Sequence, residues 1–139
     1  MSVARILVVD DFLPWLLSVQ QMLQSETDLS IVATATDGPR AIDKAMELQP
    51  EVILMDLGLP GMNGLEATRQ IRQRCPACRV LFLTGDHSPQ LIAAAFQAGG
   101  LGYVWKTDSH LDLLAGIRAV LRGESFVSRS LANWRDFSG

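Results

Sequence analysis

The sequence predicts an α/β fold, a doubly wound five-stranded parallel sheet with helices on both faces. Five short apolar runs alternate with five helical patterns, and three of the runs are almost wholly aliphatic. Alternation of this kind indicates βαβ units, whose right-handed crossovers make the strands parallel. Aliphatic strands without polar alternation are typical of a sheet that is covered on both faces.

The expected strands are short apolar runs, at residues 5–9, 30–35, 52–55, 80–83 and 102–105. The expected helices carry apolar residues at helical spacing, at residues 14–25, 39–48, 65–74, 89–98 and 109–121. Pro39 follows a glycine, which is a helix-start signal, and Ser109 is the expected N-cap of the last helix. Residues 1–122 then form one domain. The polar, serine-rich stretch 123–139 is expected to be a linker or a frayed C-terminal tail with no output domain.

Length and composition exclude several classes of protein. A chain of 139 residues suits one domain, and 48% hydrophobic with 19% charged residues is ordinary for a soluble protein. The apolar runs are strand-length and the N-terminus lacks a signal-peptide pattern, so we expect no membrane association and a cytoplasmic location. The net charge of −3 predicts no direct binding of nucleic acid by this chain.

The two cysteines, Cys75 and Cys78, form a C-P-A-C motif of the kind found in redox pairs. A thioredoxin-like pair begins a helix, whereas this one follows a helical segment and precedes a strand. Two cysteines are also too few for a structural zinc site. We therefore expect a helix–strand connection with Pro76 as the helix stop.

Polar side chains follow the expected strands. Asp10 and Asp11 come after the first strand, Asp56 after the third, Thr84 after the fourth and Lys106 after the fifth. Doubly wound sheets bind ligands at the carboxyl ends of their strands, where these groups would meet. Three carboxylates repel one another unless a cation offsets them, and oxygen ligands favour a hard ion such as Mg²⁺. With a lysine and a hydroxyl nearby, the arrangement suits phosphate chemistry, and a carboxylate can be the nucleophile.

Four motifs in this order, "ILVVDD", "VILMDLGLPGMNG", "LFLTG" and "GYVWK", resemble the receiver domain of two-component response regulators. The resemblance covers roughly residues 4–122 and implies the flavodoxin-like (βα)5 fold. It implies that Asp56 accepts a phosphoryl group from the phosphohistidine of a sensor histidine kinase or phosphotransfer protein. It also implies that Asp11 and Asp56 ligate Mg²⁺, with Asp10 acting mostly through water and the Gly58 carbonyl as a further ligand.

The same resemblance assigns a switch. Lys106 would pair with the phosphoryl group, Thr84 would hydrogen-bond it, and Tyr103 would be the aromatic partner that turns inward when Thr84 moves. Such a domain catalyses its own phosphorylation and dephosphorylation, yet acts as a signalling switch. The glycines of the site are expected to leave room and backbone freedom around the phosphoryl group, at Gly58, Gly61, Gly64 and Gly85.

Two features bear on partners and output. The stretch "LRGESFVSRSLA" resembles the linker of NarL/FixJ-type regulators, in which a DNA-binding domain follows the receiver and regulates transcription. By resemblance, a kinase would dock on the first helix, where Trp15, Gln20 and Gln24 are the expected exposed residues, and a homodimer is a further expected partner. The alternative is a stand-alone or phosphorylation-independent protein-interaction module with the same fold.

Overall fold

The computed structural model describes residues 2–136 and has six parallel strands in the order β2-β1-β3-β4-β5-β6. The strands are β1 Ala4–Val9, β2 Leu29–Ala35, β3 Val52–Met55, β4 Arg79–Thr84, β5 Gly102–Trp105 and β6 Phe126–Val127. The α-helices are α1 Leu13–Leu23, α2 Gly38–Leu48, α3 Gly64–Arg74, α4 Pro89–Gln97 and α5 Ser109–Leu121. Three short 3₁₀ helices are η1 Lys106–Asp108, η2 Arg129–Leu131 and η3 Trp134–Asp136.

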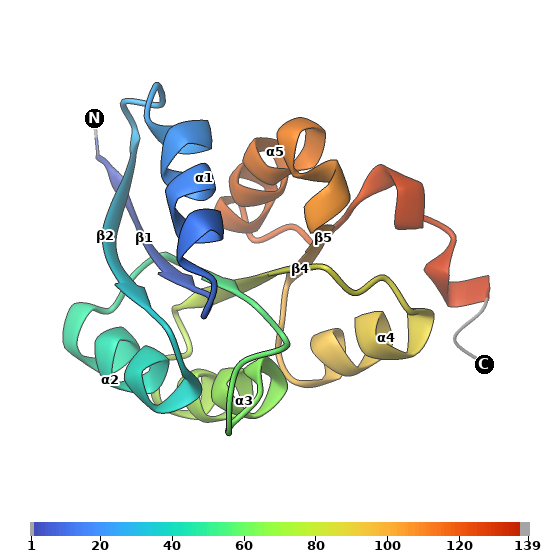
Figure 1. Cartoon of the computed structure of the whole chain (residues 1–139), viewed down its shortest axis with the longest axis horizontal. Coiled ribbons are helices and arrows are strands. Elements are labelled where there is room, and N and C mark those ends of the chain that lie inside the picture. The colour runs from blue at the N-terminus through green and yellow to red at the C-terminus, as the bar shows by residue number, and fades with distance from the viewer. Residues whose placement is uncertain (1, 137–139) are drawn as a thin grey trace.

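The sheet separates two apolar layers, which confirms the predicted architecture. Helices α1 and α5 cover one face and α2, α3 and α4 cover the other (Figure 1). Successive residues of a strand serve opposite layers: Ile53 and Met55 pack toward α2, α3 and α4, whereas Val52 and Leu54 pack toward α1 and α5. Because both faces are buried, these strands need aliphatic residues at every position.

Local signals set most helix ends. The side chains of Asp37, Asn63 and Ser88 accept hydrogen bonds from backbone N–H groups in the first turns of α2, α3 and α4. The expectation for the last helix was wrong, because Ser109 is the first residue of α5 and Asp108 is its N-cap, without a side-chain capping bond. No helix within residues 2–136 is long and apolar enough to cross a membrane.

The C-terminal stretch differs from the expected five-strand sheet and frayed tail. Residues 126–127 pair with β5 as a sixth strand, and Trp134, 9% exposed, stacks on Phe96 of α4. In Figure 1 this red segment leaves α5, passes β5 and runs toward α4. A two-residue strand has no detectable periodicity, so the sequence could not reveal it. Residues 137–139 of the expected tail lie outside the described part of the chain.

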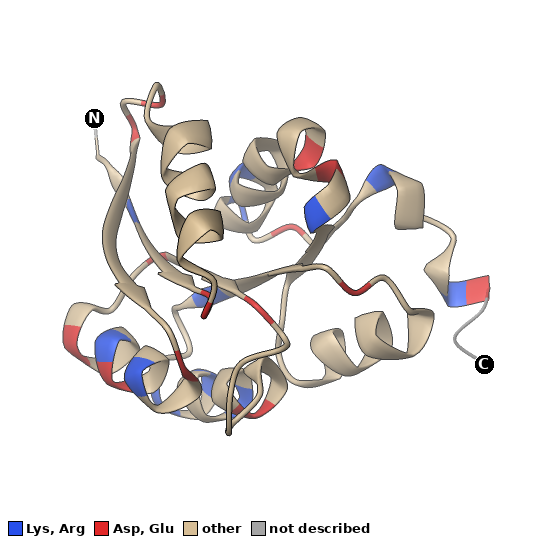
Figure 2. Cartoon of the chain, viewed as in Figure 1, with Lys and Arg blue, Asp and Glu red and all other residues tan. Residues whose placement is uncertain are grey.

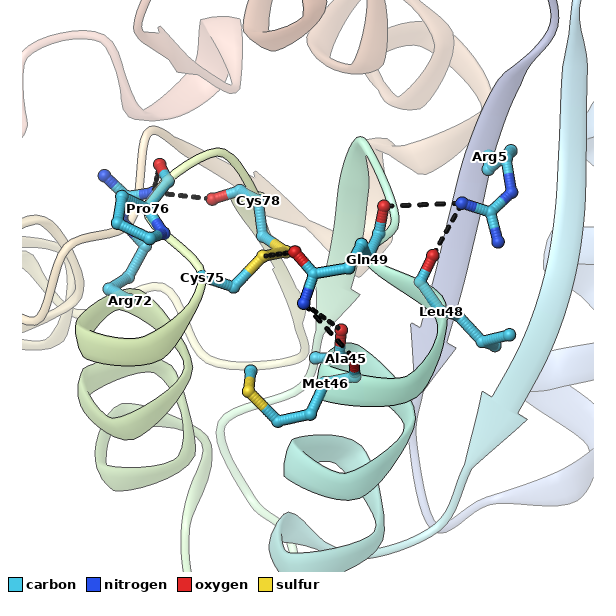
Figure 3. Close-up of a disulfide and its surroundings, with 9 residues drawn as sticks. All are labelled: Arg5, Ala45, Met46, Leu48, Gln49, Arg72, Cys75, Pro76 and Cys78. Carbon is cyan, nitrogen blue, oxygen red and sulfur yellow. Dashed lines mark hydrogen bonds between the residues drawn. A yellow bond between two sulfur atoms is a disulfide. The ribbon is translucent and has the colours of Figure 1, made fainter.

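The connection between α3 and β4 contains a disulfide between Cys75 and Cys78, which the sequence did not lead us to expect (Figure 3). The helix ends at Arg74, as the Pro76 signal predicted. Both cysteines are buried, and Gln49 Oε1 lies 3.3 Å from Cys75 Sγ. The Arg72 guanidinium donates to the carbonyls of Pro76 and Cys78 and closes the turn.

Reduction of this disulfide is expected to lower the free energy of unfolding. The bond joins residues three apart in sequence, and loop-closure entropy for so short a loop is worth roughly 2 kcal/mol. Urea unfolding with and without a phosphine reductant measures the difference. A Cys75→Ala/Cys78→Ala variant is the control and should not respond to the reductant. An unchanged midpoint, with both thiols shown free by alkylation, would contradict the expectation.

Candidate functional site

The carboxyl ends of four neighbouring strands bring the predicted polar residues together. Asp10 follows β1, Asp56 follows β3, Thr84 ends β4 and Lys106 follows β5. Figure 2 shows acidic positions in loops at this edge of the sheet. The site lies at the carboxyl ends of β1 and β3. The strand order reverses between these two strands. It opens on a cavity of about 420 Å³ whose lining includes Asp56, Gly58, Thr84, Gly85, Asp86 and Lys106.

Three carboxylates gather closely. Ligand oxygens of Asp10, Asp11 and Asp56 lie within 4.8 Å of one another. Asp10 and Asp56 are buried and Asp11 is exposed. Each buried carboxylate accepts one nearby backbone hydrogen bond, from Phe12 N at 2.9 Å to Asp10 and from Leu57 N at 3.0 Å to Asp56. These bonds orient the carboxylates but do not neutralise them, so the cluster attracts cations.

Lys106 is the cation within the cluster. Its Nζ lies 2.6 Å from Asp10 Oδ2 and 3.8 Å from Asp56 Oδ1. The same Nζ lies 5.1 Å from the centre of the Trp15 ring, at cation–π distance. The lysine is therefore shared by two carboxylates and the face of one aromatic ring, and its side chain is 22% exposed.

Burial and the neighbouring charge of Asp10 raise the pKa of the Asp56 carboxyl above its ordinary value. The charge of Lys106 and hydrogen bonds from Thr84 and the Leu57 N–H oppose this rise. The net upward direction means that the site destabilises a lone negative charge on Asp56. A carboxylate with little solvation and its oxygens exposed to a cavity is suited to nucleophilic attack.

The four glycines of the site suit their positions for different physical reasons. A Cβ on Gly64 would lie 2.1 Å from the Asp56 carbonyl oxygen, so only glycine allows α3 to begin against this backbone. Gly61 has a φ of 71°, in the left-handed region. Gly58 and Gly85 have open space where a Cβ would be. Of the four predicted glycines, Gly58 and Gly85 leave the site open and the other two shape its backbone.

Thr84 and Tyr103 lie on neighbouring strands behind the site, and both are buried. The Tyr103 hydroxyl donates to the Asp86 carbonyl at 2.9 Å, and burial raises the pKa of that hydroxyl. The Asp86 N–H contacts Thr84 Oγ1 at 3.4 Å. The ring of Tyr103 thus already points inward in this structure, and its predicted movement stays a prediction.

Comparison with known proteins identifies the family. The sequence model of the family described as "response regulator receiver domain" matches residues 6–118 of this chain. The chain belongs to the response regulator receiver family. This confirms the resemblance that the four motifs predicted.

The receiver is similar to full regulators and to isolated domains. It is 37% identical over 121 residues to the response regulator protein VraR of Staphylococcus aureus, a match that covers 87% of this chain and 58% of the relative. The chain therefore spans little more than half the length of that relative. A LuxR-family two-component response regulator from Aurantimonas sp. SI85-9A1 superposes with a TM-score of 0.91 at 36% identity, over 95% of this chain and 94% of the other.

A more distant structure shares the receiver fold. The receiver domain of the putative response regulator NarL from Mycobacterium tuberculosis superposes with a TM-score of 0.84 at 24% identity. The match covers 89% of this chain and all of the other. It supports the flavodoxin-like arrangement of strands and helices.

Sequence reasoning missed two contacts of this receiver. Trp15 was expected to be exposed on α1, but it is partly buried and lies beneath Lys106. Trp105 Nε1 donates to the Gly85 carbonyl at 3.2 Å and so ties β5 to the loop after Thr84. A tryptophan next to the predicted Lys106 was the one available signal. The sequence could not show that Trp15 contacts Lys106 or that Trp105 bonds to Gly85, because the two residues of each pair are distant in the chain.

Gly64→Ala is expected to destabilise the receiver by about 1–3 kcal/mol, because its methyl group would overlap the Asp56 backbone. Gly58→Ala is the matched control and should change stability by less than about 0.5 kcal/mol, since open space surrounds its Cβ position. Urea unfolding of the two variants beside the parent measures both. Equal effects would contradict the close approach at Gly64.

The raised pKa of Asp56 predicts a pH-dependent effect of Asp56→Asn. Above the ordinary value of 3.8, the unfolded chain loses the Asp56 proton before the folded protein does, so stability falls as the pH rises through the interval between the two pKa values. Without metal, the Asn variant should be more stable than the parent at pH 7, and the difference should shrink toward pH 3.8. Asp43→Asn, at an exposed position of α2, controls for loss of one charge. A parent as stable as the variant at pH 7 would contradict the predicted direction.

Proposed function

We propose that this receiver accepts a phosphoryl group on Asp56 from the phosphohistidine of a partner sensor histidine kinase or phosphotransfer protein. The observation that carries the proposal is a buried carboxylate that faces a cavity, with a lysine ammonium 3.8 Å away and the buried Thr84 on the same cavity wall. In the transfer, an Asp56 oxygen forms a bond to phosphorus while the bond from phosphorus to the imidazole nitrogen breaks. The imidazole keeps the electron pair and takes a proton from solvent.

The residues present suit Mg²⁺ as the resident metal. The donors are all oxygens, and the cluster contains three carboxylates and one lysine, which leaves net negative charge for a divalent cation. Asp11 and Asp56 would ligate the ion, Asp10 would act mostly through water, and the Gly58 carbonyl would add a ligand. The ion would supply charge neutralisation on the phosphoryl oxygens. Lys106 would contact the same oxygens, and Thr84 would donate its hydroxyl hydrogen to one of them.

The added charge then changes the surface. A phosphoryl group brings strong acceptor oxygens that draw Thr84 toward Asp56, and a modest difference in affinity shifts the balance between two conformations. The Tyr103 ring, already buried in this structure, would stay inward once Thr84 has moved, and β5 and α4 would present a different face to partners. The proposed output is transcription regulation through a DNA-binding domain outside residues 1–139, as in the NarL/FixJ-type regulators whose linker the stretch "LRGESFVSRSLA" resembles. A homodimer is the accompanying assembly, and the cytoplasm is the proposed location.

The test is the intact mass of the protein after incubation with Mg²⁺ and acetyl phosphate. One added phosphoryl group is expected in the parent, and none without Mg²⁺ or in Asp56→Asn. Lys106→Met should slow the modification by about a hundredfold, the size of effect seen when one charge-stabilising donor is lost. Lys44→Met is the matched control, because Lys44 is the one other lysine of the sequence and pairs with Glu47 on α2.

A parent protein that gains no mass either hydrolyses its phosphoryl group rapidly or does not react. If the parent gains no mass, a beryllofluoride titration followed by ¹⁹F NMR distinguishes rapid hydrolysis from a site that does not react. A bound beryllofluoride signal that is absent in Asp56→Asn would retain the proposal. No response to either reagent would reject phosphorylation and leave the phosphorylation-independent interaction module as the function.

A further inference from the structure

The segment 124–136, which we call the strap, is held by three different elements of the receiver. It begins after α5, pairs with β5 through β6, and ends against α4 through η3. Val127, Leu131 and Trp134 join the apolar layer that contains α4, whereas Phe126 packs against the layer that contains α5. The strap is therefore part of the folded domain and lies along the outer side of β5.

The attachment to β5 centres on Ser128, which is fully buried. Its N–H donates to the Tyr103 carbonyl at 2.9 Å, and its Oγ accepts from the Trp105 N–H at 2.9 Å. One residue of the strap thus satisfies both of the outward-facing backbone groups at the end of β5. Loss of the strap would leave these groups without those partners, as at any open sheet edge.

The attachment to α5 is electrostatic. Asp112, in the first turn of α5, is only 2% exposed and accepts hydrogen bonds from both the N–H and the Nε of Arg129, each at 3.2 Å. The Ser130 hydroxyl donates to the Asp108 carboxylate beside it. The strap therefore supplies partners to two acidic groups at the start of this helix.

The attachment to α4 is aromatic. The Trp134 ring stacks on Phe96 with 5.8 Å between centroids and 18° between planes. Burial of an indole against a ring contributes more apolar contact than any other single side chain of the strap could. This third contact lies on a different helix from the Asp112 contact, on the opposite face of the sheet.

The residues of β5 that hold Ser128 also reach the wall of the phosphoacceptor cavity. Trp105 donates from its indole to the Gly85 carbonyl, and Tyr103 donates from its hydroxyl to the Asp86 carbonyl. The Asp86 carboxylate in turn accepts from the N–H of Ser88, the N-cap of α4. The loop after Thr84 is thus bonded directly to β5 and to the start of α4, which carry two of the three strap contacts.

We propose that the strap is a releasable latch, docked while Asp56 is unmodified and loosened when a phosphoryl group draws Thr84 and the following loop toward Asp56. This inference rests on the phosphorylation proposed above. Displacement of the loop pulls on Trp105 and on the start of α4, whereas Asp112 belongs to α5, which has no bond to the loop among the described contacts. The strap cannot follow α4 and remain on α5 at once, so its contacts separate.

The strap has the local structure of a segment that opens easily. Its regular elements are a two-residue strand and two single turns of 3₁₀ helix, and the backbone N–H groups that bond to the rest of the protein are those of Glu124, Phe126, Ser128 and Arg129. Segments with so few backbone bonds open at a lower free energy than the core of a domain. Release would uncover the edge of β5 and the ring of Phe96.

Hydrogen exchange of the full chain tests the latch. Exchange is measured by mass spectrometry in Mg²⁺ alone and in Mg²⁺ with beryllofluoride, and ¹⁹F NMR of the same samples reports binding at Asp56. Peptides that contain residues 126–128 are expected to exchange at least about tenfold faster in the adduct, whereas peptides from β1 and β3 keep their rates. Bound fluoride with unchanged or slower strap exchange would overturn the latch and leave the phosphoacceptor role intact. An absent fluoride signal, together with no mass gain from acetyl phosphate, would reject both.

Two variants test the attachments without modification of Asp56. Ser128→Ala removes the acceptor for Trp105 N–H and should speed exchange in the strap several-fold in Mg²⁺ alone, whereas Ser18→Ala, on α1, is the matched control and should not. Trp134→Leu removes the ring stack and should have the same effect. Far-UV circular dichroism verifies folding. Strap exchange at the parental rate in both folded variants would overturn the assignment of these contacts.

Discussion

The ion pair between Lys106 and Asp10 is the interaction on which the site depends. Two carboxylates are buried at the carboxyl edge of the sheet, and within residues 2–136 the Lys106 ammonium is the one that pairs with both. Burial alone would favour the protonated form of Asp56, which could not act as a nucleophile. The face of the Trp15 ring also attracts this ammonium through a cation–π contact. This contact holds Lys106 at the site and leaves the carboxylate oxygens available to other cations. The proposed metal would therefore compete for Asp10 with the Lys106 ammonium, which could keep its contact with the Trp15 ring.

The site has a rigid part, which carries Asp10 and Asp56, and an adjustable part, which is the loop after Thr84. Asp10 and Asp56 follow the last four residues of β1 and the whole of β3, which are buried on both faces of the sheet, so the acidic groups have fixed positions. The loop after Thr84 is held mainly by polar contacts to β5 and to α4. Polar contacts can be exchanged for new ones to a phosphoryl group, whereas apolar packing in a dense core resists small displacements. The proposed phosphoryl charge, added at the rigid part, would thereby be converted into movement at the adjustable part.

The candidate site could be predicted from sequence because its residues obey one rule of topology. Every parallel strand delivers the residue that follows it to the same edge, so Asp56, Thr84 and Lys106 meet even though they are far apart in the chain. The contacts of Trp15 and Trp105 escaped this reasoning because a tryptophan on a helix or strand has several directions open to it. The Cys75–Cys78 bond escaped because the spacing fits a simple turn equally well.

The sequence by itself determined the class of fold, the elements β1 to β5 and α1 to α5 to within about two residues at each end, and the acidic residues of the site. Periodicity and capping are local properties, so they can be read from neighbouring residues. Only the tertiary structure decided that β6 joins the sheet, that Trp134 packs on Phe96, and that Lys106 lies between Asp10 and Trp15. These contacts join residues that are distant in the chain, and their formation depends on surfaces that exist only after the sheet and its helices have assembled.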